Sequence, residues 1–173
     1  MQLEIPKGVD AKVEGGFITV SGKAGSAKAK INTKMLNVKI ENGKVEITVT
    51  DAKKLKRVAM MAERALAGRL SGLFDGVQNK IERKMTVAYV HFPIALELSG
   101  NTLIIKNIFG ERAPRKAKLV GNTKLEIKGQ NITVSGVDPY EVGQTITNIT
   151  KACKIVNKDT RIFQDGIYEV AGE

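Results

Sequence analysis

Apolar and polar residues alternate through most of the first fifty positions, a pattern that predicts β-strands with one buried face. The alternating runs cover residues 11–14, 17–21, 28–31, 38–41 and 45–50. Gly15-Gly16 and Asn42-Gly43 separate neighbouring runs and are typical of tight hairpin turns. We therefore expect antiparallel strands at the start of the chain.

The period of the pattern changes after this strand-rich segment. Between Ala52 and Leu73 the apolar residues recur at intervals of three and four, which predicts an amphipathic helix. Asp51 is a suitable N-cap residue for this helix, and Gly72 or Gly76 is expected to end it.

The second half of the chain repeats the same order of elements. Alternating runs predict strands at residues 95–98, 102–106, 116–119, 124–127 and 131–135. Asp138 then caps a helix that begins at Pro139 and runs to about Cys153. Residues 80–90 are predicted to form a strand that joins the two halves.

Matching positions in the two halves indicate a duplication. The tripeptide Ile-Thr-Val occurs at 47–49 and at 132–134, which are 85 residues apart, and Asp51 and Asp138 precede the two helices. We predict an α+β fold made of two tandem copies of a small unit, each an antiparallel sheet with one helix. The two units are expected to cover residues 1–86 and 87–173.

Cysteine and histidine counts argue against catalysis and metal binding. The chain has one cysteine, Cys153, and one histidine, His91, which excludes multi-cysteine metal sites and leaves little for a zinc site or a catalytic triad. No phosphate-binding glycine loop is present. We interpret His91 as structural and Cys153 as a buried, inert thiol, and we expect no catalytic residue, metal or cofactor; an unrecognised active site is the alternative.

Charge points to the class of partner. The sequence has 28 Lys and Arg against 18 Asp and Glu, a formal charge of +10, which favours a polyanionic partner such as nucleic acid. Residues 1–86 carry +8 of this charge and residues 87–173 carry +2. No secretory signal and no apolar run long enough to span a membrane is found, so we expect a soluble intracellular protein without a membrane partner.

Equivalent basic segments occur in both halves, next to the matching glycines Gly25 and Gly110. The first contains Lys23, Lys28 and Lys30. The second contains Arg112, Arg115, Lys116 and Lys118. Arg112 and Arg115 are the better candidates for phosphate contacts because a guanidinium group can pair with two oxygens at once. The alternative is that both segments are solvated, lysine-rich loops.

A further basic segment lies after the second helix. It combines cations with amide and aromatic side chains, namely Lys158, Arg161, Gln164 and Tyr168. Such residues together reach phosphate, sugar and base edges of RNA. The alternative is that the aromatic and apolar residues attach this segment to the second core, and the two interpretations are compatible.

Several of these segments resemble a known family. Residues 158–168, Lys-Asp-Thr-Arg-Ile-Phe-Gln-Asp-Gly-Ile-Tyr, are similar to the C-terminal signature of the archaeal and eukaryotic branch of the ribosomal protein L6 family. Residues 89–94, residues 107–112 and the opening residues 5–9 resemble the same branch in the same order. The resemblance therefore extends over essentially the whole chain.

The resemblance implies two tandem α+β domains and a structural protein of the large ribosomal subunit, in the cytoplasm. It implies binding to large-subunit ribosomal RNA (rRNA) near the sarcin–ricin loop and the site where translation factors dock. Neighbouring ribosomal proteins are further implied partners. On this basis Arg112, Arg115, Lys116, Lys118 and Arg161 are expected to contact phosphates, and Lys158 is a further expected rRNA-binding residue. Gln164 and Tyr168 are expected either to reach sugars or bases or only to brace the tail, and Lys23, Lys28 and Lys30 to make secondary contacts. A free-standing nucleic-acid-binding regulator or chaperone is the alternative.

Overall fold

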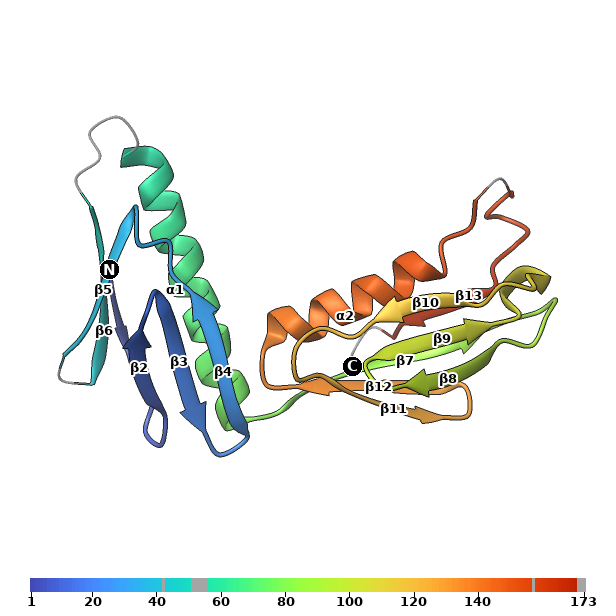
Figure 1. Cartoon of the computed structure of the whole chain (residues 1–173), viewed down its shortest axis with the longest axis horizontal. Helices are drawn as coiled ribbons and strands as arrows, with labels where there is room; N and C mark the ends of the chain where they lie inside the picture. The colour runs from blue at the N-terminus through green and yellow to red at the C-terminus, as the bar shows by residue number, and fades with distance from the viewer. Residues whose placement is uncertain (42, 51–55, 157, 171–173) are drawn as a thin grey trace. The chain divides into compact units, whose positions relative to one another are not determined.

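The computed structural model describes the chain except for residues 42, 51–55, 157 and 171–173. The chain divides into two compact units, Met1–Lys80 and Ile81–Glu173. Each unit contains antiparallel strands and one helix of three turns or more (Figure 1). The predicted α+β fold class is therefore confirmed.

The first unit contains two three-stranded sheets. One has the order β1-β6-β5, with β1 at Gln2–Glu4, β5 at Leu36–Glu41 and β6 at Lys44–Val49. The other has the order β2-β3-β4, with β2 at Asp10–Glu14, β3 at Phe17–Gly22 and β4 at Gly25–Lys30. The helix α1, Lys56–Gln78, packs against strands of both sheets (Figure 1). Fully buried side chains from the strands and the helix form the core of the unit, including Ile18, Ile47, Leu70 and Leu73.

The helix α1 is longer at its C-terminal end than its glycines suggest. It passes through Gly72 and Gly76 and ends at Gln78, so the prediction that one of these glycines ends it was wrong. The reason is that Phe74 and Val77 continue the buried face for another turn, and this packing outweighs the low helix propensity of glycine. The expected N-cap, Asp51, lies outside the described residues.

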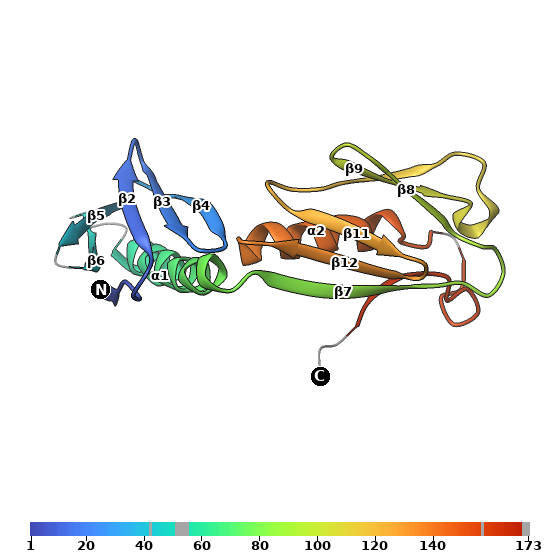
Figure 2. The same cartoon turned by 90° about the horizontal axis from the view of Figure 1, so that it is seen from below.

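The second unit also contains two antiparallel sheets. The order of the four-stranded sheet is β11-β12-β7-β13, with β7 at Ile81–Ala88, β11 at Lys124–Lys128, β12 at Asn131–Gly136 and β13 at Gly166–Glu169 (Figure 2). The order of the other sheet is β10-β9-β8, with β8 at Ala95–Ser99, β9 at Thr102–Lys106 and β10 at Arg115–Lys118. The helix α2, Pro139–Ala152, packs against strands of both sheets. Its predicted cap is present, because the Asp138 carboxylate accepts a hydrogen bond of 2.9 Å from the Tyr140 N–H.

The division between the units differs from the expected one. The sequence interpretation divided the chain between residues 86 and 87, whereas the contacts divide it between Lys80 and Ile81. The reason is that β7 is a central strand of the second unit, paired with β12 on one side and with β13 on the other. The segment that the sequence assigned to a connection is therefore part of the second core.

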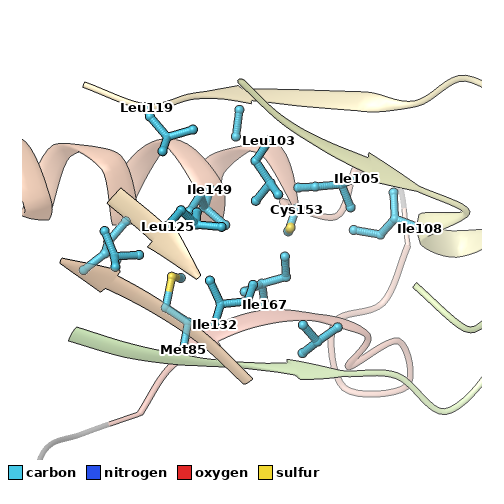
Figure 3. Packing of buried hydrophobic residues seen from close by; sticks show 14 of the residues in the cluster. Met85, Leu103, Ile105, Ile108, Leu119, Leu125, Ile132, Ile149, Cys153 and Ile167 are labelled. Carbon is cyan, nitrogen blue, oxygen red and sulfur yellow. The ribbon is translucent and has the colours of Figure 1, made fainter. Parts of the chain in front are cut away.

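The second core lies between α2 and the strands (Figure 3). Met85 and Ile132 contribute to it from β7 and β12, and Leu103 and Ile105 contribute from β9. Cys153 is buried at the end of α2, and burial raises the pKa of its thiol to about 11, although a backbone hydrogen bond and Arg115 oppose this shift. Cys153 is therefore a buried packing residue with little reactive thiolate at neutral pH, as the sequence predicted.

Close packing between β3 and α1 provides a test of the first unit. A Cβ atom added at Gly22 would lie 2.8 Å from the Val77 carbonyl oxygen and 3.1 Å from the Val77 Cβ. We expect Gly22→Ala to lower the free energy of unfolding by about 1–3 kcal/mol, because backbone cannot move aside easily. Gly68→Ala is the matched control, since an added Cβ at this site in α1 has no neighbour within 4 Å. Gly68→Ala is expected to raise the free energy of unfolding by about 0.5–1 kcal/mol. Denaturant titration measures both effects, and equal effects of the two substitutions would contradict the close packing of Gly22 against Val77.

Candidate nucleic-acid interface

Two segments far apart in the sequence meet in the second unit. The loop, residues 107–114, connects β9 to β10, and the tail, residues 158–165, leads from α2 to β13. Phe109 of the loop is buried, with the Arg115 Cζ 5.4 Å and the Lys158 Nζ 5.8 Å from its ring centroid. The Lys158 ammonium also lies 4.6 Å from the centroid of the Phe163 ring. These cation–π contacts join the loop to the tail, and we call Phe109, Glu111, Arg115, Lys158 and Phe163 the loop–tail junction.

Arg115 is the central hydrogen-bond donor of this junction. Its Nε and one terminal nitrogen donate to the two carboxylate oxygens of Glu111 over 2.8 and 2.6 Å. The other terminal nitrogen donates to the backbone carbonyls of Ala152 and Lys154, both over 2.9 Å. The hydrogen bonds from Arg115 lower the pKa of Glu111, so the pair stays charged at neutral pH. Arg115 thus fastens the loop to the end of α2, and most of its donors are used within the protein.

The loop backbone is strained at Phe109. Asn107 and Phe109 have φ angles of 60° and 53°, in the left-handed region that residues with bulky side chains rarely adopt. The Asn107 side-chain amide donates a hydrogen bond of 3.0 Å to the Pro93 carbonyl. Burial of Phe109 and its two cation contacts offset the strain, so the ring is held under Arg115 and Lys158.

A buried carboxylate holds the tail on its other side. The Asp165 side chain is fully buried and accepts hydrogen bonds from the backbone N–H groups of Val90, at 2.9 Å, and His91, at 3.4 Å. The His91 Nδ1 also lies 3.4 Å from Asp165 Oδ1. Burial alone would raise the pKa of Asp165, but these hydrogen bonds lower it below its usual value. The His91 ring packs 5.2 Å from the Phe163 ring, centroid to centroid, which agrees with a structural role for this histidine.

The other predicted cations of the second unit lie on its surface. Alternation along β10 puts Lys116 and Lys118 on the face opposite to the buried Ala117. Arg112 in the loop and Arg161 in the tail are also exposed, and none of these four side chains forms an ion pair or hydrogen bond with the described part of the chain. Arg112 and Arg161 therefore lie on the two segments that the junction joins, and Lys116 and Lys118 lie on β10, the strand that follows the loop.

Gln164 and Tyr168 make contacts within the tail. The Tyr168 hydroxyl donates a hydrogen bond of 2.8 Å to the Gln164 carbonyl, and the Gln164 amide donates one of 3.3 Å to the Arg161 carbonyl. Both residues are nevertheless exposed, with 49% of Tyr168 accessible to solvent. They brace the tail, and their exposed surfaces stay available to a ligand.

The predicted secondary contacts lie in the first unit. Lys23 is in the turn between β3 and β4, and Lys28 and Lys30 are on β4, opposite Thr19 and Phe17 of β3. All three lysines are exposed. The strand β4 occupies the place in the first unit that β10 occupies in the second, at the edge of a three-stranded sheet beside the helix.

Three important residues of the interface were not identified from the sequence. Phe109 and Glu111 lie in the segment that was singled out for its arginines, and Asp165 lies in the tail. A carboxylate within an otherwise cationic or apolar segment was the available signal for Glu111 and Asp165. The signal is ambiguous because an exposed acid would give the same pattern, and only the fold shows that Asp165 is buried.

Among the described residues, no three His, Cys, Asp or Glu side chains are grouped in a way that could hold a metal ion. No helix in the described part of the chain is long and apolar enough to cross a bilayer.

Two tandem α+β units with unpaired cations on a braced loop and tail define a basic binding protein suited to a polyanionic ligand. A profile of the ribosomal protein L6 family matches residues 92–166. The chain is 41% identical to the large ribosomal subunit protein uL6 of Archaeoglobus fulgidus over 97% of its length and 87% of the relative. It is 37% identical to the uL6 protein of Methanosarcina mazei, over 97% of this chain and 94% of the relative. It is also 37% identical to the uL6 protein of Methanococcus vannielii, over 98% of this chain and 91% of the relative. The chain therefore belongs to the ribosomal protein L6 family, as the sequence resemblance indicated, and it is a structural protein and not an enzyme.

Proposed function

We propose that this protein is a constituent of the large ribosomal subunit in the cytoplasm, where it binds large-subunit rRNA and neighbouring ribosomal proteins and supports assembly and translation. The observation that carries the proposal is similarity over nearly the whole chain to proteins named as large ribosomal subunit protein uL6. The family resemblance of the tail further suggests a position near the sarcin–ricin loop and the translation-factor site.

The second unit supplies the main RNA-binding surface in this proposal. Arg112 from the loop, Lys116 and Lys118 from β10, and Lys158 and Arg161 from the tail are exposed cations on connected segments. Phosphate oxygens accept hydrogen bonds from such side chains, while Gln164 and Tyr168 are placed to reach sugars or base edges. Lys23, Lys28 and Lys30 of the first unit would add weaker, salt-sensitive attraction.

Arg115 is assigned a positioning role rather than a direct phosphate contact. Its guanidinium already donates to Glu111 and to two carbonyls at the end of α2. A phosphate would have to displace at least one of these hydrogen bonds. The arginine instead keeps the loop and tail in one arrangement, which reduces the entropy that RNA binding must overcome.

Arg112→Ala tests the direct phosphate contacts. We expect weaker binding to a large-subunit rRNA fragment and a decrease of about 0.9 in the slope of log affinity against log salt, by analogy with duplex DNA. Lys124→Ala is the control, because Lys124 is an exposed cation on β11, the edge strand of the other sheet. The measurement is fluorescence anisotropy at several salt concentrations. An unchanged slope for Arg112→Ala, or the same change for Lys124→Ala, would count against this surface.

Sedimentation separates the proposal from that of a free-standing regulator. A ribosomal constituent is expected to sediment almost entirely with the large subunit when cell extract is fractionated on a sucrose gradient. A regulator or chaperone would be found mainly in the free fractions. Residue-level crosslinking within the subunit then tests the proximity to the sarcin–ricin loop.

A further inference from the structure

A cavity of about 390 Å³ opens beside the loop–tail junction. Lys151, Cys153 and Lys154 line it from the end of α2, and Thr160 and Phe163 line it from the tail. Ile167 and Tyr168 line it from β13. The volume is in the range of sites that hold small organic ligands.

The lining of this cavity is mostly apolar. The Cys153 thiol is protonated at neutral pH because burial raises its pKa to about 11, and Ile167 is fully buried. The aromatic residues Phe163 and Tyr168 are partly or largely exposed. An apolar ring inserted here would therefore move from water into contact with aliphatic carbon, sulfur and aromatic rings, which is favourable.

The opening of the cavity is cationic. Lys151 and Lys154 are exposed, and neither forms an ion pair with a described residue. The single acid among the lining residues is Asp165, whose carboxylate is fully buried and bound to Val90 and His91. A ligand that enters thus meets positive charge at the rim and an uncharged interior.

We propose that this cavity receives one unstacked nucleobase of the bound rRNA, with the flanking phosphates on Lys151 and Lys154. The inference rests on the proposed function and adds a defined base-binding site to it. A nucleotide matches both parts of the site, because the base is a flat ring that packs on aromatic side chains and the backbone carries the negative charge. The position of the cavity also agrees with a bound nucleotide. Phe163 lines the cavity, and its ring centroid lies 4.6 Å from the ammonium of Lys158, one of the proposed rRNA-binding cations.

A trinucleotide tests whether the site recognises a base. The probes are the RNA trimer adenylyl-adenylyl-adenosine and the same trimer with an abasic ribose in the middle. Ile155 lines the cavity, and its methyl resonances in a ¹³C-labelled full-length protein are expected to shift with the first probe and to shift much less with the second. Ile47, in the core of the first unit, is the internal reference and should not respond. Equal shifts with both trimers, or none at millimolar concentration, would overturn the proposal.

Thr160→Trp tests the site in the rRNA complex. Thr160 is exposed and lines the cavity, so a bulky side chain fills the space without entering the core. Stacking on an aromatic residue contributes roughly 5- to 150-fold per base. We expect the substitution to weaken binding to a large-subunit rRNA fragment about tenfold with an unchanged salt slope, because no cation is removed. Thr147→Trp, at an exposed position of α2 outside the cavity lining, is the control and should have no effect.

The two experiments separate this inference from the function on which it rests. If the wild type binds the rRNA fragment and Thr160→Trp binds it equally well, the base site is refuted and the proposed function stands. If the wild type does not bind the fragment, the proposed function fails, and the trimer titration still decides whether the cavity takes a base. A shift of Ile155 with an acidic, apolar peptide and with neither trimer would assign the cavity to a protein partner and overturn the proposal.

Discussion

Replacing Asp165 with alanine is expected to lower the free energy of unfolding of the second unit by roughly 2–4 kcal/mol. The carboxylate is fully buried and accepts hydrogen bonds from the Val90 and His91 backbone N–H groups. Alanine would leave these donors without a partner in a site from which water is excluded, and such donors are costly. It would also release the tail from Val90 and His91, which removes the support of the proposed RNA-binding surface.

Denaturant titration of the full-length protein measures this effect. Asp159→Ala is the matched control, because Asp159 belongs to the same tail but is exposed, and its carboxylate accepts a hydrogen bond from the Arg161 N–H, while the bonds to its backbone carbonyl survive the substitution. It is expected to cost less than about 1 kcal/mol. If both substitutions have the same effect, Asp165 does not hold the tail.

The hydrogen bonds to Asp165 also give a dependence on pH with a defined sign. They lower the pKa of Asp165 in the folded state below its unfolded value of about 3.9. The stabilisation is therefore fully present above the unfolded pKa and is lost as the pH falls through the folded pKa. The difference in unfolding free energy between wild type and Asp165→Asn is expected to be largest at neutral pH and to shrink below about pH 4. A difference that grows on acidification would refute this account.

Arg115→Ala is expected to weaken rRNA binding tenfold or more while leaving the salt slope nearly unchanged. The substitution removes the bidentate pair with Glu111 and the hydrogen bonds to the Ala152 and Lys154 carbonyls, all of which join the loop to the end of α2. We expect the loop then to lose its attachment to the end of α2, so that its cations are no longer held in one arrangement relative to the tail. A stability loss of about 1.5–3 kcal/mol should accompany this change, because the pair is partly buried and charge-assisted.

Arg115→Lys distinguishes positioning from direct contact. Lysine keeps the charge, but a single ammonium group cannot bond both Glu111 oxygens and two carbonyls in the planar geometry of arginine. We expect Arg115→Lys to bind RNA nearly as weakly as Arg115→Ala in the anisotropy titrations. Restoration of affinity by lysine, together with a slope decrease of about 0.9 in Arg115→Ala, would instead indicate that Arg115 contacts a phosphate. Lys116→Ala, at the neighbouring outward position of β10, is the comparison, and under the proposed function it is expected to weaken binding with a decrease in the salt slope.

Hydrophobic periodicity was sufficient to predict most of the fold. In the second unit, strands β8 to β12 and helix α2 lie within one residue of their predicted bounds. The predictions missed β1 and β13, which have three and four residues. Runs this short contain too few alternations to define a period, and both strands exist because β6 and β7 offer edges to pair with.

The sequence could not distinguish the cations that face solvent from those that are bound within the protein. Arg112 and Arg115 were selected for the same reason, yet Arg112 is exposed without a partner in the described chain, whereas Arg115 is bound to Glu111 and to α2. The two arginines are three positions apart, and nothing in their neighbouring residues distinguishes their roles. The difference arises because Arg115 begins β10 and shares the inward face of that strand with the buried Ala117.

The sequence by itself determined the duplicated α+β unit, the family and the polyanionic class of partner. These properties depend on periodicity, charge and local motifs, which the order of residues carries directly. The tertiary structure decided that β7 belongs to the second unit, that the buried Asp165 is bound to the backbone of Val90 and His91, and that the end of α2, the tail and β13 line an apolar cavity. These properties depend on contacts between residues tens of positions apart, and such contacts are fixed only when the chain folds.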